Sequence, residues 1–267
     1  MPFSSVIAAT DLSERSAHVP GRARRLAQSP GAQVVLAHVM PDEGKKRRTR
    51  DEIETALTDA AAEAGANGIR VLTGESGAAL SALAKAEHAG LIVLGLHRER
   101  RVLDVLRLTT MERIVLAAPC PVLIAQLPPD RAYRQILLAT DFSPGSAAAL
   151  IAAARLAPNA EFHAIHALQL PLGAVFGRGN RDSDLALERA EAARDTFMQT
   201  PGLPRLAEPV EIVPGGVHQV LTFRREELGA DLLCIGAQSG KDPNTLGNYA
   251  RDLMRAPPTD VLVAKGS

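Results

Sequence analysis

Two short polar runs in this chain combine residue types that could do chemistry. Thr10-Asp11-Leu12-Ser13 follows an apolar run near the start, and Thr140-Asp141-Phe142-Ser143 follows a similar run in the middle. A second serine, Ser16 or Ser146, comes three residues after each motif. Hydroxyl and carboxylate oxygens are hydrogen-bonding groups. The chain contains no Gly-x-Ser-x-Gly nucleophile motif and no Walker-type phosphate loop, so an enzyme is the weaker function class.

The histidines and cysteines do not form a catalytic or metal-binding set. His38 and His166 occupy equivalent places at strand ends, where structural histidines are expected. His163 and His166 are three residues apart on a strand, so they project to opposite faces and cannot share a metal. Cys120 and Cys234 belong to no CxxC or Cys/His cluster. We interpret both thiols as small buried side chains.

The two polar motifs belong to an internal repeat. Asp11 and Asp141 are 130 residues apart, about half of the 267-residue chain. A second pair of features has matching spacing, because Gly74 to Gly95 and Gly215 to Gly236 both span 21 residues. Such self-similarity indicates two related domains in tandem. The Pro128-Pro129 linker separates them, and we expect domains at residues 1–128 and 132–267.

Short apolar runs alternate with segments of helical composition, which predicts parallel strands joined by helices. In the first half the expected strands are Val6–Thr10, Gln33–Val39, Ile69–Thr73, Leu91–Gly95 and Val122–Ala125. The expected helices between them are Ser13–Ala27, Arg50–Ala64, Ala78–Glu87 and Thr109–Ala117. In the second half the expected strands are Ile136–Thr140, Glu161–Leu168, Pro209–Val213, Leu232–Gly236 and Val261–Ala264. The fold class is therefore α/β, with helices on both faces of each sheet.

Composition excludes several function classes. Lys plus Arg and Asp plus Glu both total 30, so there is no overall basic field for nucleic acid. Aromatic residues are only 3% and tryptophan is absent, which removes the usual base-stacking groups. The basic run Lys45–Arg50 leads directly into acidic residues and is interpreted as a solvated loop and helix start. No apolar run approaches the roughly 20 residues of a membrane span, so we expect a cytoplasmic protein.

Many short motifs, in order and in both halves, resemble the universal stress protein family in a tandem form. The resemblance covers nearly the whole chain. Its carriers are the two Thr-Asp-x-Ser motifs, His38-Val39 and His166-Ala167, the runs Ala89–Gly95 and Ala230–Gly236, and the closing segments Met111–Ile124 and Pro258–Val263. It implies two flavodoxin-like domains, each a five-stranded parallel sheet of order 3-2-1-4-5, of the adenine nucleotide alpha hydrolase-like type.

Nucleotide-binding members of this family hold ATP through a glycine pattern after the fourth strand. It runs Gly, two residues, Gly, nine residues, Gly, then Ser or Thr; glycines let backbone N–H groups approach phosphates at a helix N-terminus. The second half keeps much of this pattern with altered spacing. The resemblance therefore implies an ATP site, with or without Mg²⁺, formed by Thr140, Asp141, Ala167, Gly236, Gly240, Gly247 and Asn248.

The first half has lost most of the glycine pattern. Gly95 is present, but Arg98 and Leu108 occupy the next two glycine positions. Their side chains would fill space meant for phosphate. Arg98 and its neighbours Arg100 and Arg101 either attract an anion or form a solvated basic loop. The weaker site implied here consists of Thr10, Asp11, Val39, Gly95 and Thr109.

These residues support a stress-response protein that binds an adenine nucleotide as a regulatory ligand in its C-terminal half. The alternative is a nucleotide-free interaction or scaffold protein of the same fold, because the first loop is damaged and the second is altered. Slow ATP hydrolysis is motivated only by the resemblance. In family dimers the fifth strands pair across the interface; here Val122–Ala125 and Val261–Ala264 are expected to pair within the chain. Further homodimerisation is expected, without nucleic-acid or membrane partners.

Overall fold

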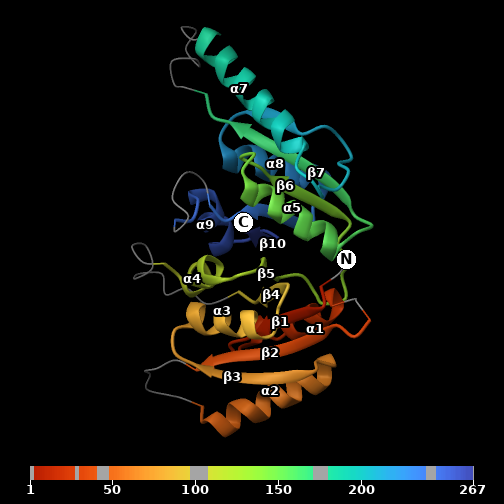
Figure 1. Cartoon of the computed structure of the whole chain (residues 1–267), viewed down its shortest axis with the longest axis vertical. Helices are drawn as coiled ribbons and strands as arrows, with labels where there is room; N and C mark the ends of the chain where they lie inside the picture. The colour runs from red at the N-terminus through yellow and green to blue at the C-terminus, as the bar shows by residue number, and fades with distance from the viewer. Residues whose placement is uncertain are drawn as a thin grey trace.

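The computed structural model describes residues 3–27, 30–40, 48–96, 108–170, 180–238 and 245–266. These residues form a ten-stranded sheet with helices on both faces (Figure 1). The strand order is β3-β2-β1-β4-β5-β10-β9-β6-β7-β8. Counted within each half, both sets of five strands have the order 3-2-1-4-5, and all pairs inside a half are parallel. The predicted α/β class with two similar halves is confirmed.

The expected strands all form, with ends shifted by up to two residues. They are β1 (Ser5–Ala9), β2 (Gln33–Met40), β3 (Gly68–Thr73), β4 (Leu91–Leu94), β5 (Val122–Ile124), β6 (Gln135–Ala139), β7 (Glu161–Leu168), β8 (Glu211–Pro214), β9 (Leu232–Gly236) and β10 (Asp260–Ala264). The helices are η1 (Glu14–Ser16), α1 (Val19–Leu26), α2 (Arg50–Ala64), α3 (Ser76–Ala86), α4 (Thr110–Ala117), α5 (Pro144–Leu156), α7 (Asn180–Met198), α8 (Val217–Leu228) and α9 (Asn248–Arg255).

Alternation along the strands creates two apolar cores, one on each face of the sheet. Val6 and Ala8 of β1 point into a core that includes side chains of α1, α2, α5 and α7. Ile7, between them, points into the other core, which includes side chains of α3, α4, α8 and α9. Because both faces are covered, the strands are Val, Ile and Leu runs with few polar interruptions.

The two halves join through their last strands. β5 pairs with β10 in antiparallel register, with Leu123 opposite Leu262 at the centre of the pair. In Figure 1 these strands lie in the middle of the molecule, between the two halves. This is the intrachain pairing that the sequence resemblance implies. It converts two exposed sheet edges, which invite aggregation, into one continuous hydrogen-bonded sheet.

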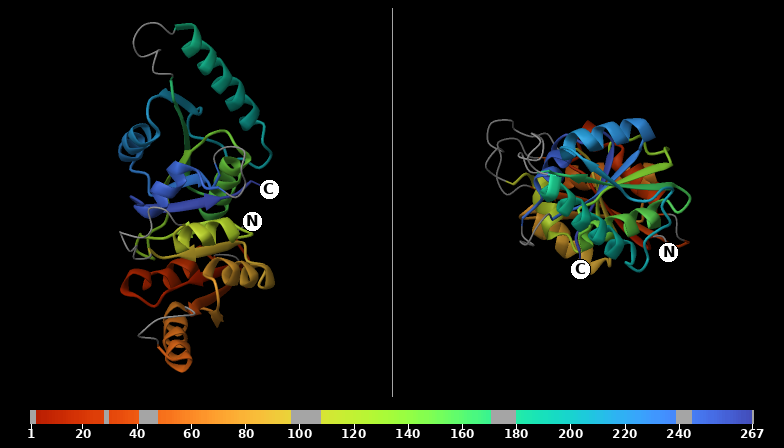
Figure 2. Two further views of the ribbon diagram at one scale, coloured as in Figure 1. Left: turned by 90° about the vertical axis from the view of Figure 1, so that its left-hand side faces the viewer. Right: turned by 90° about the horizontal axis from the view of Figure 1, so that it is seen from above.

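One helical segment differs from the sequence expectation. The segment Ser13–Ala27 was expected as one helix, but it forms the short 3₁₀ turn η1 followed by α1. Pro20 lacks an amide hydrogen and occupies the second position of α1, so a helix starting at Ser13 cannot run through it. The long helix α7 lies between β7 and β8, as α2 lies between β2 and β3, and Figures 1 and 2 show it projecting from the end of the second half.

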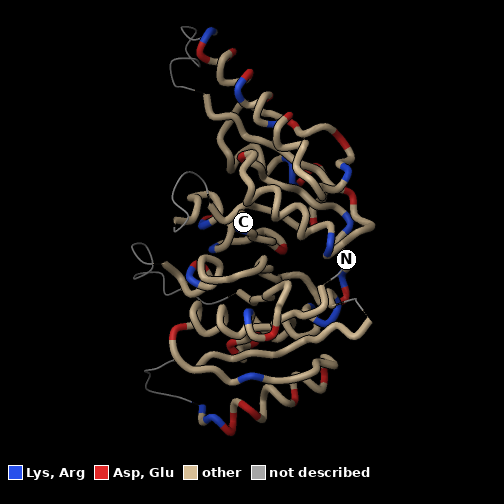
Figure 3. The backbone as a smooth tube through the Cα atoms, viewed as in Figure 1, with Lys and Arg blue, Asp and Glu red and all other residues tan. Residues whose placement is uncertain are grey.

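Charged residues of both signs are interspersed along the tube in Figure 3, in agreement with the equal totals of acidic and basic residues. No helix among the described residues is long and apolar enough to cross a membrane.

Candidate functional site

Each half has a cavity at the carboxyl ends of its strands, where α/β sheets commonly bind ligands. The cavity of the second half has a volume of about 320 Å³. It is lined by residues that include Ala139, Thr140, Asp141, Ser146, Ile165, His166, Ala167, Val217, Leu221, Gly236, Gly247, Asn248 and Tyr249. The cavity of the first half has a volume of about 470 Å³. Its lining includes Thr10, Asp11, Ser16, Ala37, His38, Val39, Ser76, Leu80, Leu94, Gly95, Thr110, Met111 and Ile114.

The Thr-Asp-x-Ser motif forms a tight turn at the corner of the second cavity. Thr140 Oγ1 accepts a hydrogen bond from the Phe142 amide at 2.8 Å. Asp141 Oδ1 accepts from the Ser143 amide at 3.0 Å and from Ser146 Oγ at 2.7 Å. Phe142 has a φ of 63°, a left-handed conformation that side chains rarely adopt. The polar side chains therefore hold a strained turn in place.

The first half builds the same turn with the same atoms. Asp11 Oδ1 accepts from the Ser13 amide at 3.0 Å and from Ser16 Oγ at 2.7 Å. Thr10 Oγ1 accepts from the Leu12 amide at 3.0 Å, and Leu12 has a φ of 59°. The recurrence of the motif in the sequence therefore has a structural cause that is independent of any ligand.

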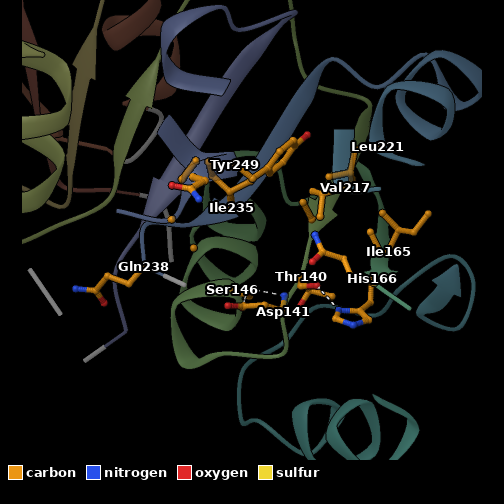
Figure 4. A pocket seen from close by; sticks show the side chains of 17 residues that line it. Thr140, Asp141, Ser146, Ile165, His166, Val217, Leu221, Ile235, Gln238 and Tyr249 are labelled. Atoms are coloured by element: carbon orange, nitrogen blue, oxygen red, sulfur yellow. Dashed lines mark hydrogen bonds between the residues drawn. The ribbon is translucent and has the colours of Figure 1, made fainter. Parts of the chain in front are cut away.

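The two histidines at equivalent strand ends, His38 and His166, each form a hydrogen bond with the backbone of the neighbouring turn. His166 Nδ1 lies 2.8 Å from the Thr140 carbonyl oxygen, and His38 Nδ1 lies 2.9 Å from that of Thr10. A carbonyl only accepts, so each Nδ1 carries the proton, and Nε2 of the neutral ring is an acceptor. Phe142 stacks on His166 with ring centroids 4.6 Å apart. In Figure 4, His166 lies beside the turn on the polar side of the cavity.

Close backbone packing explains the glycine at the end of the fourth strand of each half. A Cβ on Gly236 would lie 3.0 Å from the Ser146 amide nitrogen and 3.1 Å from the Gly145 carbonyl carbon. A Cβ on Gly95 would lie 2.9 Å from Cα of Ser16. A side chain at either position would press on residues of the polar turn, so close packing favours glycine at both.

The structure gathers most of the residues that the sequence singled out. Six of the seven expected in the second half line its cavity: Thr140, Asp141, Ala167, Gly236, Gly247 and Asn248. Four of the five expected in the first half line the other: Thr10, Asp11, Val39 and Gly95. Thr109 is the N-cap of α4, and its neighbour Thr110 lines the cavity instead. Gly240, Arg98, Arg100 and Arg101 lie outside the described residues.

Sequence reasoning missed the apolar walls. Val217 and Leu221 come from the first turns of α8, Ile165 from β7, and Tyr249 from the first turn of α9. Figure 4 shows Val217, Leu221 and Tyr249 across the cavity from the polar turn. The available signal was their position: helices that follow parallel strands begin at the ligand-binding edge of the sheet, so their first-turn side chains face it.

The last helix of each half begins differently. α4 begins with a capping box, in which Thr109 Oγ1 accepts from the Glu112 amide at 3.2 Å and Glu112 Oε2 accepts from the Thr109 amide at 2.7 Å. α9 begins with Gly247 as N-cap, which has no side chain to offer. The positive end of α4 therefore has an internal carboxylate, whereas α9 receives none from its own N-cap.

Glu112 also links the two halves. Its side chain is fully buried, and Oε1 accepts from Arg255 Nε at 3.1 Å and Arg251 Nε at 3.3 Å. Both arginines belong to α9. The Thr109 amide and the two arginines of α9 thus hold the Glu112 carboxylate at the start of α4.

The two cysteines are free thiols, of which Cys234 is buried and Cys120 is half-buried. Burial raises the pKa of the Cys120 thiol to about 12 and that of Cys234 still further. Burial likewise raises the pKa of the Tyr249 hydroxyl, against a smaller opposing effect of Arg225. Among the described residues, no three His, Cys, Asp or Glu side chains are placed to hold a metal ion. The cavities are of a size and composition that can bind a small molecule.

Comparison with known proteins agrees with this architecture. Residues 2–126 and 132–265 each match the model of the universal stress protein family. No curated protein matches the chain by sequence.

Solved structures of similar length share the fold over nearly the whole chain. A protein from Pseudomonas aeruginosa UCBPP-PA14, described as a provisional universal stress protein, is 23% identical to this chain. The match has a TM-score of 0.63 and covers 98% of this chain and 93% of the Pseudomonas chain. A functionally unknown protein from Pseudomonas aeruginosa PAO1 is 22% identical, with a TM-score of 0.65 over 99% and 93%. A universal stress protein from Archaeoglobus fulgidus is 18% identical, with a TM-score of 0.65 over 98% and 96%.

Proposed function

Since the chain belongs to the universal stress protein family, we propose that it is a regulatory stress-response protein whose C-terminal half binds an adenine nucleotide. The observation that carries this proposal is Gly247 at the start of α9, on the wall of the second cavity. A helix N-terminus without a side-chain cap favours a phosphate, because its N–H groups and dipole both attract negative charge.

The rest of the cavity fits the other end of a nucleotide. Ile165, Val217 and Leu221 supply apolar contacts for a base, and Asp141 supplies a carboxylate across the cavity from Val217 and Leu221. A volume of about 320 Å³ is near the lower limit for small-molecule sites, which span about 300–1,000 Å³. The cavity therefore suits the adenosine part, with the phosphates directed toward α9.

A nucleotide-free scaffold is the second candidate. One specific observation favours it: the Thr-Asp-x-Ser turn and Gly236 are both explained by hydrogen bonding and backbone packing alone. Under this reading the site residues persist because the fold needs them. The protein would then act through its surface.

A titration of thermal stability with ATP and Mg²⁺ separates the two candidates. A ligand at 100 times its dissociation constant stabilises the folded state by about 2.7 kcal/mol. Gly247→Asp and Gly247→Asn form a matched pair, because both are good N-caps and differ only in charge. Gly247 has φ −60° and ψ 142°, so either residue fits its backbone.

We expect ATP to raise the melting temperature of the unaltered protein. Gly247→Asp should weaken ATP binding at least tenfold, because its carboxylate repels phosphate, and Gly247→Asn should weaken it less. Leu108→Asp, at the residue just before the N-cap of α4 in the first half, is the control and should leave the titration unchanged. No stabilisation at millimolar ATP would favour the scaffold, and phosphate release above background would instead indicate hydrolysis.

A further inference from the structure

The cavity of the first half differs from its counterpart in size. Ala37 occupies the strand position that Ile165 occupies in the second half, since each is the register partner of the alanine before Thr-Asp. Ser76 begins α3 where Val217 begins α8. All four residues line their cavities. The smaller side chains of the first half explain why its cavity measures about 470 Å³ against about 320 Å³.

Most of the wall of this larger cavity is apolar, with polar groups gathered at one corner. Leu80, Leu94, Met111 and Ile114 form the wall on the side of α3 and α4. Asp11, Ser16 and His38 lie at the opposite corner, on the turn after β1 and at the end of β2. An engineered 150 Å³ cavity is known to hold benzene, so this one has room for about two fused rings.

The start of α4 disfavours an anion in this cavity. Two amides of this helix start already have acceptors, since the Glu112 amide donates to the Thr109 hydroxyl and the Thr109 amide donates to the Glu112 carboxylate. Glu112 is held there from below by Arg251 and Arg255, so it cannot readily turn aside. A second carboxylate, Asp11, lies on the cavity wall. An anionic ligand would therefore face the Asp11 carboxylate and a helix end that is already capped.

We propose that the first-half cavity is a separate ligand site, which takes an uncharged molecule with an apolar body of about two rings and a hydrogen-bonding group at one end. The apolar wall binds the body, and the corner formed by Asp11, Ser16 and His38 binds the polar end. Phosphorylated molecules bind more weakly, because Asp11 lies on the wall and the start of α4 is already capped. This site does not depend on nucleotide binding by the second half, so one proposal can fail without the other.

The test uses 2-naphthol and its matched anion 2-naphthyl phosphate on the full chain. Met111 lines the cavity, so its methyl carbon resonance, assigned by Met111→Leu, reports binding at this site. We expect 2-naphthol to shift this resonance in a saturable manner, and 2-naphthyl phosphate to bind at least tenfold more weakly. Equal responses to the two probes, or no response to 2-naphthol at millimolar concentration, would overturn the proposal.

Variants that copy the second half identify the cavity as the binding place. Ala37→Ile and, separately, Ser76→Val should each weaken the 2-naphthol response at least tenfold by filling the space. Ser76 is half-buried at a helix start, so its variant is expected to fold even if Ala37→Ile does not. Val217→Ser, in the second half, is the control and should leave the response unchanged. Loss of the response in the control but not in Ser76→Val would place the probe elsewhere and refute the site.

Discussion

At the residue scale, Asp11 and Asp141 show how one side chain serves the fold before it serves a ligand. In each, Oδ1 accepts from a backbone amide two residues on and from a serine hydroxyl five residues on. The hydroxyl bonds of 2.7 Å are short, as expected where the acceptor is charged. The sequence pattern was interpreted as a ligand-binding corner, and the structure adds that this corner is a turn stabilised by its own polar atoms.

This dual role predicts a stability change in the absence of any ligand. Asp141→Ala should lower the free energy of unfolding by about 1.5–3 kcal/mol, because two hydrogen bonds to a charged acceptor are lost. Asp11→Ala should have a similar effect, since its contacts are the same. Urea unfolding of the ligand-free protein measures both. Asp141→Asn, which keeps an acceptor oxygen, is the control and should cost less. A wild-type stability for Asp141→Ala would mean that the carboxylate serves only a ligand.

The residue scale also limits what one sequence can say about the site. Thr140, Asp141 and Gly236 were predictable because each directly follows or ends an apolar run, and strand ends meet at one edge of a sheet. Tyr249 and Val217 were not, because an apolar residue in a helix is normally assigned to the core. Only the position of each at the first turn of its helix distinguishes it, and that requires the helix start to be known.

At the element scale, the helix starts decide how the two halves differ. α4 carries a complete capping box, and α9 begins at a glycine in the same place. The same strand-and-helix unit therefore presents a neutralised helix end in one half and a positive one in the other. The damaged glycine pattern of the first half indicated this divergence, but it did not reveal that the Glu112 side chain takes part in capping α4.

Elements with strong local signals were predicted well. The strands are continuous Val, Ile and Leu runs. The helix α2 has Thr49 as its N-cap and Gly65 as a left-handed C-cap, and its predicted bounds match those observed. The prediction of one helix over Ser13–Ala27 was wrong, because the composition of the segment is helical but Pro20 prevents one continuous helix. Composition alone does not reveal where a proline divides such a segment.

Removal of the α4 cap tests its contribution directly. Thr109→Ala should lower the free energy of unfolding by about 1 kcal/mol, because the Glu112 amide loses its acceptor. Thr109→Ser retains a hydroxyl and should restore most of the loss. Thermal or urea unfolding of the two variants provides the comparison. Identical stabilities would show that the Glu112 carboxylate, with its arginine partners, maintains the helix start without the hydroxyl.

At the scale of the whole molecule, the two halves form one sheet and share a buried polar cluster around Arg22 and Asp260. Arg22 of α1 and Asp260 of β10 form an ion pair of 2.8 Å, with both side chains fully buried. Asp260 also accepts from the Tyr133 hydroxyl at 2.5 Å and from the amides of Gln126 and Leu127. The cluster thus joins the first half, the linker and the last strand of the second half.

The sequence could not predict this buried cluster, for a physical reason. Arg22 and Asp260 are 238 residues apart, and no local spacing relates them. Asp260 does stand out as a charged residue at the start of a fully buried strand. A buried carboxylate must have partners, so its presence there indicates that a donor lies nearby without saying which one.

The pair predicts strong coupling between the halves. Arg22→Met should cost about 3–5 kcal/mol, because it leaves the Asp260 carboxylate buried without its cation. Arg22→Met with Asp260→Asn should cost less than the two single changes added together, by about 0.5–3 kcal/mol. Urea unfolding of the full chain supplies the four free energies. Arg50→Met is the control, since its ion pair with Glu54 is 58% and 44% exposed and should contribute less than about 1 kcal/mol. Strictly additive losses would mean that Arg22 stabilises α1 and the linker through its carbonyl contacts and the Tyr133 ring, and that its pair with Asp260 does not couple the halves.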